Sequence, residues 1–179
     1  MIKRVVLAAF TVLIMIQAAA AQQGASPASE DEKTRPGKEE IIGSMIKSAR
    51  MSSQQQDSQL NQILKNQSES KTPRSDFLFC IGPAYRGVGK AQLCVAKAYE
   101  TGRGVVEDQI EAYIWYALAL ENKSSAGAAE QSLQADKQRL KDKLQTAYPF
   151  PSDEELEDQL KSLQDRIAQY QSDFKKEKR

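Results

Sequence analysis

The chain opens with one apolar run and then becomes polar. The run follows Lys3 and Arg4 and gives way to small residues that end in an Ala-x-Ala site at Ala21. This order is typical of a secretory signal peptide, so residues 1–21 are predicted to be removed and residues 22–179 to be exported, secreted or periplasmic. An uncleaved membrane anchor is the alternative, although the run is shorter than the roughly 20 residues that span a bilayer.

Polar residues dominate the next part, residues 22–75. Its first half is rich in Ser, Pro, Gly and charge and cannot bury enough apolar surface to fold. Apolar residues then return at helical spacing in residues 41–49 and predict a short amphipathic helix. A weaker apolar set, Leu60 to Leu64, fits a marginal helix and plain disorder equally well. We therefore predict a mostly disordered linker with one or two weak helices, and a folded part that starts near Asp76.

A clear helix-turn-helix pattern follows. Helical spacing runs from Ala91 to Tyr99, and Gly102 and Gly104 then interrupt it. Glycine adopts the left-handed conformation that ends many helices, and Asp108 can cap the next helix by accepting free backbone N–H groups. The second helix repeats apolar residues at i, i+3, i+4 and i+7: Ala112, Trp115, Tyr116 and Ala119. The pattern predicts an αα-hairpin in which Tyr99 and Trp115 share one core.

This hairpin resembles the Sel-1-like repeat, a relative of the tetratricopeptide repeat that builds α-solenoids. The matching positions, in register, are Tyr99, Gly102, Gly104, Val105, Asp108, Ala112, Trp115, Tyr116 and Ala119. The match covers about residues 91–122, which is one repeat. The resemblance implies a scaffold or adaptor for other proteins. Because a solenoid usually needs about three repeats to bury a continuous core, other elements must cover the faces of this one.

Two further helices are predicted after the hairpin. Residues 126–145 carry a narrow apolar stripe (Ala129, Leu133, Leu140, Leu144), typical of a capping helix with one solvated face. Prolines stop that helix, and Ser152 with Glu155 forms a capping box for the next. The last helix has a coiled-coil spacing: Leu156, Leu160, Leu163, Ile167, Tyr170 and Phe174. This 156–174 seam either folds back on the preceding helix or binds another chain, including a second copy.

The predicted fold is therefore all-α. It comprises a disordered N-terminal arm, a Sel-1-like repeat domain at residues 76–148 with its capping helix, and a heptad-patterned helix at residues 149–179. Composition narrows the chemistry, because the chain has 0 histidines. Catalytic relays through histidine, imidazole metal ligands and His-ligated haem are excluded. No cofactor or metal site is predicted.

The chain has 2 cysteines, Cys80 and Cys94. An even count in an exported chain favours a disulfide, worth roughly 3 kcal/mol by loop entropy, while two buried free thiols are the alternative. The formal net charge of the whole chain is +1 with both signs interspersed, so no strong field steers it to nucleic acid or a membrane surface.

Three functions fit these patterns. The first is a non-enzymatic interaction or scaffold module that binds another protein of the envelope. The second is a structural accessory subunit of a larger membrane-associated complex, docked through residues 41–49 or the 156–174 seam. The third is a cell-wall hydrolase that uses carboxylates such as Glu107 and Asp108, although capping explains Asp108 without catalysis. We expect the first, and no enzymatic activity.

Overall fold

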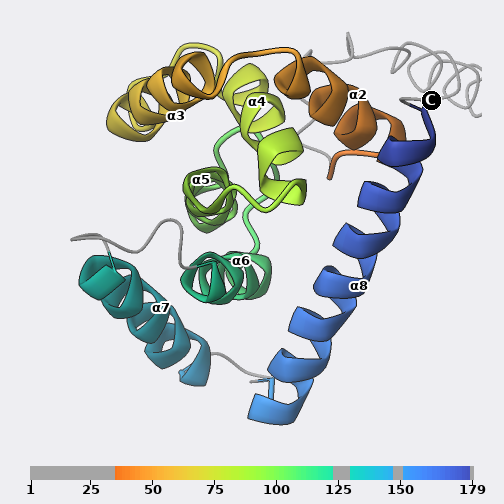
Figure 1. The fold of residues 1–179 in the computed structure, drawn as a ribbon. Helices are drawn as coiled ribbons and strands as arrows, with labels where there is room; N and C mark the ends of the chain where they lie inside the picture. Colours follow the sequence, from red (N-terminus) through yellow and green to blue (C-terminus); the bar gives the residue numbers. More distant parts are fainter. Residues whose placement is uncertain (1–34, 123–129, 147–150, 178–179) are drawn as a thin grey trace, which may run out of the picture. The chain divides into compact units, whose positions relative to one another are not determined.

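The fold was analysed in a computed structural model, which describes residues 35–122, 130–146 and 151–177. Within these ranges the regular structure is helical, without a strand, which confirms the predicted all-α class. Figure 1 shows the arrangement. The helices are α2 (Lys38–Ala49), α3 (Ser53–Asn66), α4 (Pro73–Tyr85), α5 (Gly89–Thr101), α6 (Gln109–Glu121), α7 (Glu130–Gln145) and α8 (Asp153–Glu177). The predicted signal peptide and residues 22–34 of the predicted arm lie outside the described residues.

The predicted linker needs a correction from residue 35 onward. Its apolar residues form two helices, α2 and α3, that pack on the repeat, with Met45 and Leu60 both 0% exposed. α2 packs against α4, and α3 packs against α5. The sequence underrated these helices because each is weak alone, whereas burial of one apolar face against a preformed neighbour supplies most of a short helix's stability. The folded part begins well before Asp76.

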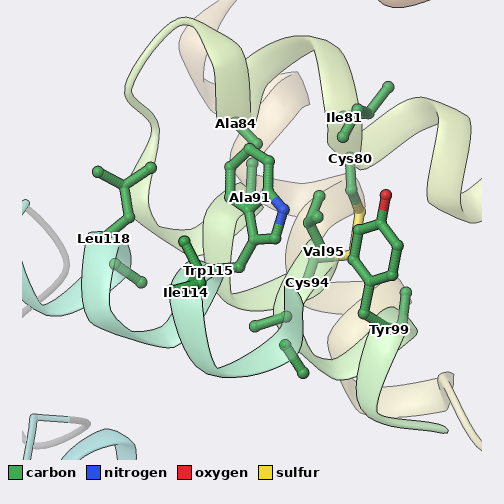
Figure 2. Packing of buried hydrophobic residues seen from close by; sticks show 14 of the residues in the cluster. Cys80, Ile81, Ala84, Ala91, Cys94, Val95, Tyr99, Ile114, Trp115 and Leu118 are labelled. Carbon is green, nitrogen blue, oxygen red and sulfur yellow. A yellow bond between two sulfur atoms is a disulfide. The ribbon is translucent and has the colours of Figure 1, made fainter. Parts of the chain in front are cut away.

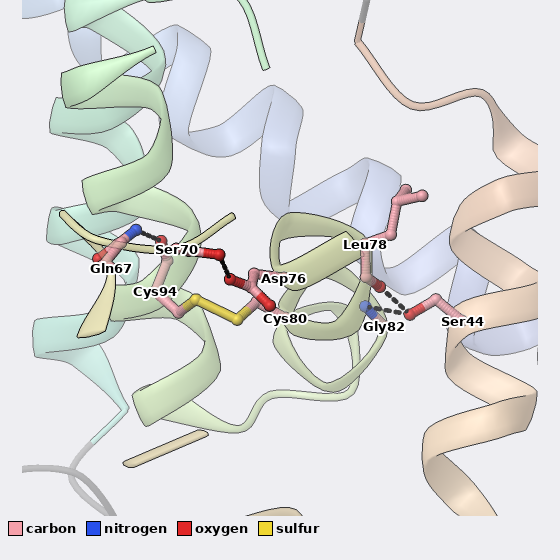
Figure 3. Close-up of a disulfide and its surroundings, with 8 residues drawn as sticks. All are labelled: Ser44, Gln67, Ser70, Asp76, Leu78, Cys80, Gly82 and Cys94. Carbon is pink, nitrogen blue, oxygen red and sulfur yellow. Dashed lines mark hydrogen bonds between the residues drawn. A yellow bond between two sulfur atoms is a disulfide. The ribbon is translucent and has the colours of Figure 1, made fainter. Parts of the chain in front are cut away.

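The hydroxyl group of Ser44 bridges α2 and α4. Pro83 lies inside α4, where a proline ring opens the helical hydrogen-bond ladder. The Ser44 side chain enters that opening: the N–H of Gly82 donates to Ser44 Oγ at 3.1 Å, and Ser44 donates to the carbonyl of Leu78 at 2.5 Å. Figure 3 shows this bridge. Any side chain at position 82 would collide with Ser44, so glycine permits the close approach of the two helices.

The two C-terminal helices, α7 and α8, pack against the helices that precede them. α7 packs on α6 through Leu133, Leu140 and Leu144, as the apolar stripe predicts; Ala129 lies outside the described residues. The Ser152–Glu155 capping box is confirmed, with both of its hydrogen bonds present.

The seam of α8 does not fold back on α7. It crosses α6, α4 and α2, which places the last helix beside the helix that begins the described chain. Leu156, Leu163 and Ile167 are buried there. Lys38 of α2 also pairs with Asp173 of α8 at 2.6 Å. α8 therefore belongs to the same compact unit as the α5–α6 hairpin.

Candidate functional site

The predicted repeat residues meet in the α5–α6 hairpin and hold its turn. Gly102 ends α5 in the left-handed conformation with φ 65°, and Gly104 has φ 76°. A side chain at Gly104 would also collide with the carbonyl of Pro73, so this glycine lets the turn lie against the start of α4. Asp108 caps α6 by accepting the N–H groups of Ile110 and Glu111, as predicted. The turn is thus a structural feature that reverses the chain and starts α6.

The core of the hairpin is aromatic and extends into α4. Trp115 and Tyr116 are 1% and 0% exposed, and Ala112 and Ala119 are buried beside them. Tyr99 and Trp115 lie in the same cluster, as Figure 2 shows. Their rings, however, pack against aromatic rings of α4 rather than against each other. The ring centroids of Tyr99 and Phe77 are 5.6 Å apart in an edge-on arrangement, and those of Trp115 and Tyr85 are also 5.6 Å apart. α4 is therefore the element that covers one face of the repeat.

A disulfide links α4 to α5, between Cys80 and Cys94, as the sequence predicts. Figure 3 shows the bond, and both cysteines are 0% exposed. A buried bond of this kind cross-links two packed helices and gives no approach to an attacking thiolate, so it is structural rather than catalytic. It fixes α5, which also lines the groove described below.

The acidic pair considered for hydrolysis is already engaged. Asp108 caps α6 and pairs with Arg35 at 2.6 Å. Glu107 is exposed and accepts a hydrogen bond from Gln109 at 2.7 Å. The two carboxylates therefore form no shared site, and the arrangement offers no general acid facing a base.

A small cavity lies between α2, α4, α6 and α8. Its volume is about 60 Å³. It is lined by Tyr85, Tyr99 and Trp115 and by the ion pair of Glu111 with Arg35, whose charged atoms are 3.2 Å apart. Burial raises the pKa of Tyr85 to about 12, so its phenol stays protonated. The indole N–H of Trp115 has no hydrogen-bond partner among the described residues. The cavity is large enough for a few ordered water molecules, since each needs about 10–15 Å³.

A larger and more open groove runs beside α5. Its volume is about 530 Å³, within the range of about 300–1,000 Å³ that is usual for ligand sites. In Figure 1, α3 and α7 lie on either side of the α5–α6 pair, and the groove takes residues from all four helices. The lining includes Leu64 and Lys65 of α3, Lys97, Glu100 and Thr101 of α5, Tyr116 of α6, and Asp136 and Arg139 of α7.

A hydrogen-bonded network forms the α7 side of this groove. Arg139 binds Glu100 at 2.7 Å and Asp136 at 3.1 Å, and the hydroxyl of Tyr116 donates to Glu100 at 2.7 Å. Burial alone would raise the pKa of the Glu100 carboxyl, but the hydrogen bonds from Arg139 and Tyr116 outweigh burial and hold that pKa below its usual value. Burial and the bond to Glu100 raise the pKa of Tyr116. Glu100 is therefore ionised and fully used in holding α7 to α5.

Sequence reasoning predicted one member of this site, Tyr116, and assigned it to the repeat core. It missed Glu100, Arg139, Lys65 and Lys97, because these residues lie on charged helix faces that look like any solvated surface. Glu100 and Arg139 are 39 positions apart, so no short-range spacing could connect them (139 − 100 = 39). Only the packing of α7 beside α5 brings them together.

Metal and membrane chemistry find no support in the part of the chain that the structure describes. No group of three or more Cys, Asp or Glu residues there could hold a metal ion. Likewise, none of the described helices is long and apolar enough to cross a bilayer.

Comparison of the chain with known protein families, with curated proteins and with solved structures finds no match. The Sel-1-like resemblance therefore stays a prediction that rests on the residues quoted for it.

Proposed function

We propose that the chain is an exported, non-enzymatic protein-protein interaction module built on a Sel-1-like repeat. The observation that carries this proposal is the open groove of about 530 Å³ beside α5. Binding sites work best on rigid elements, and α5 is held by a disulfide on one side and by the Glu100–Arg139 pair on the other. The groove is thus a preformed surface that a partner could occupy without first ordering it.

Export is supported by two independent features. The N-terminal sequence has the pattern of a signal peptide, and the Cys80–Cys94 bond is of a kind that persists in oxidising compartments. A partner would then be another secreted or periplasmic protein, such as a component of the cell envelope.

The absence of catalysis is also part of the proposal. The sequence has 0 histidines, and the carboxylates of the groove, Glu100 and Asp136, are both bound to Arg139. A general acid or base needs a carboxyl group that is free to exchange its proton with a substrate. Glu100 is instead held ionised by hydrogen bonds from Arg139 and Tyr116, and Asp136 is bound to the same guanidinium group.

The groove is favoured over the accessory-subunit alternative by the burial of the other candidate surfaces. That alternative uses residues 41–49 or the 156–174 seam for docking. In the structure Ile41 and Met45 of α2 are buried against α4, and Leu163 of α8 is 1% exposed. Docking or self-association through these faces would require α2 or α8 to leave the body first, which would expose a large part of its core.

Site-specific photo-crosslinking in the native envelope tests the proposal. A photoreactive amino acid replaces Thr101, an exposed residue at the groove, and in a matched control it replaces Ser162 on the exposed face of α8. We expect one defined adduct from position 101 and none from position 162. Adducts from position 162 alone would favour the accessory-subunit role, and adducts from neither position would contradict the proposal.

A further inference from the structure

We infer that the α3–α5–α7 groove recognises an acidic, extended segment of its protein partner, and that Lys65 and Lys97 contact the partner's carboxylates. This inference rests on the proposed function and adds the chemistry of the partner to it. It follows from an uneven balance of charge along the groove, whose lining carries more cationic side chains than anionic ones.

The acidic residues of the groove are both bound to one guanidinium group, which leaves the cluster with a single negative charge. Glu100 accepts hydrogen bonds from both Arg139 and Tyr116, and Asp136 binds the second nitrogen of the same Arg139. These contacts measure between 2.7 and 3.1 Å, so the three charged side chains form one compact cluster. Their ionic groups are occupied by one another and offer little to a partner.

Three further cationic side chains line the same groove, and one of them, Lys97, also interacts electrostatically with Glu100. Lys65 and Lys97 form no ion pair with any residue in the described ranges. Arg103 donates to the carbonyl of Ser70 at 2.8 Å, but a carbonyl carries no net charge, and its Nε is buried without a hydrogen-bond partner. The groove therefore presents net positive charge to whatever enters it, on a chain whose overall charge is only +1.

The lining favours an extended peptide over other anions. An amphipathic helix would need a continuous apolar groove, whereas Leu64 is flanked here by polar side chains such as Gln67 and Thr101. A nucleic acid places a phosphate at every nucleotide, so its backbone would have to pass the fixed carboxylates of Glu100 and Asp136. An acidic peptide can space its carboxylates to meet Lys65 and Lys97 while its uncharged residues pass the acidic cluster.

The inference is tested by fluorescence anisotropy on the protein without its signal peptide. The probe is a short labelled peptide in which glutamate alternates with serine and leucine, and the matched probe has glutamine in place of every glutamate. We expect the glutamate probe to bind, the glutamine probe to bind at least about tenfold more weakly, and added salt to weaken the first selectively. Equal binding of the two probes would overturn the inference.

Charge reversal locates the binding site. Lys65→Glu with Lys97→Glu should weaken binding of the glutamate probe by about tenfold or more, the effect of losing two exposed ion pairs and adding repulsion. The control is Lys47→Glu with Lys161→Glu, which makes the same charge change on exposed faces of α2 and α8. Equal loss in both variants would show a general charge effect and refute the groove assignment. Circular dichroism verifies that both variants keep the fold.

The crosslinked partner separates failure of this inference from failure of the proposed function. Mass spectrometry of the adduct formed at position 101 identifies the partner segment in the groove. An acid-rich segment supports the inference. A neutral or basic segment overturns the inference while the interaction role stands, and tighter binding of a single-stranded oligonucleotide than of the glutamate probe, lost in the Lys65→Glu and Lys97→Glu variant, overturns both.

Discussion

The disulfide between α4 and α5 allows the sharpest test of how this fold is held together. Cys80 and Cys94 are separated by 14 positions, and the loop between them contains the end of α4, the turn and the start of α5. By the loop-entropy account, closing a loop of about 15 residues lowers the entropy of the unfolded chain enough to stabilise the fold by about 3 kcal/mol. Replacing both cysteines with alanine removes this contribution. Alanine is the better choice than serine, since both positions are fully buried and a hydroxyl group would lack a partner.

The measurement is urea unfolding followed by far-ultraviolet circular dichroism. With an m-value of about 2 kcal/mol per molar urea, the Cys80→Ala and Cys94→Ala variant should unfold at a midpoint lower by about 1.5 M. Reduced wild-type protein should match the variant, because it lacks the same cross-link. Intact mass first verifies that the native protein is lighter by two hydrogen atoms than the reduced form. A stability difference below about 1 kcal/mol would refute the reasoning and show that packing alone holds α4 on α5.

Three further changes test other contacts. Ser44→Ala should lower the free energy of unfolding by about 1–3 kcal/mol, since Gly82 N–H and Leu78 C=O lose their bridge; an unchanged urea midpoint would mean that α4 closes the gap itself. Trp115→Ala should lower the free energy of unfolding by about 3–5 kcal/mol. A loss below about 1 kcal/mol in thermal melting would contradict the assignment of Trp115 to the core of the hairpin. Because the pKa of Glu100 is lowered in the fold, its ionised carboxylate stabilises the fold at pH values above the ordinary glutamate pKa of about 4.3. This stabilisation is lost as the pH falls through the lowered pKa. Glu100→Gln should therefore be less stable at neutral pH and decline less steeply in acid than wild type; parallel acid-unfolding curves would contradict this.

Local features were predictable because their causes lie within a few residues. Gly102 ends α5, Asp108 begins α6 and Ser152 begins α8, and each does so through its own backbone or its nearest N–H groups. The Cys80–Cys94 pairing was also predictable, because a chain with 2 cysteines allows only one disulfide within itself.

The packing of the helices against one another was harder to predict from the sequence. α2 and α3 looked like linker because their own helical signals are weak, and their place depends on distant surfaces such as the Ser44 notch in α4 and the face of α5. α8 has a heptad pattern that fits many partners, and the pattern alone cannot distinguish a preceding helix, a second copy or the α6–α4–α2 edge where it lies. Which surface is available depends on every other helix.

The sequence by itself therefore determined the helices of the repeat, their caps, the turn and the disulfide, because hydrogen bonding and steric restriction act over a few residues. The tertiary structure alone decided which helices cover the α5–α6 hairpin and where charged side chains gather. Lys65, Lys97 and Arg139 come from three helices and acquire a common surface only after α3 and α7 pack around α5. Their charges interact through space rather than along the chain, so no reading of neighbouring residues could have assembled the groove.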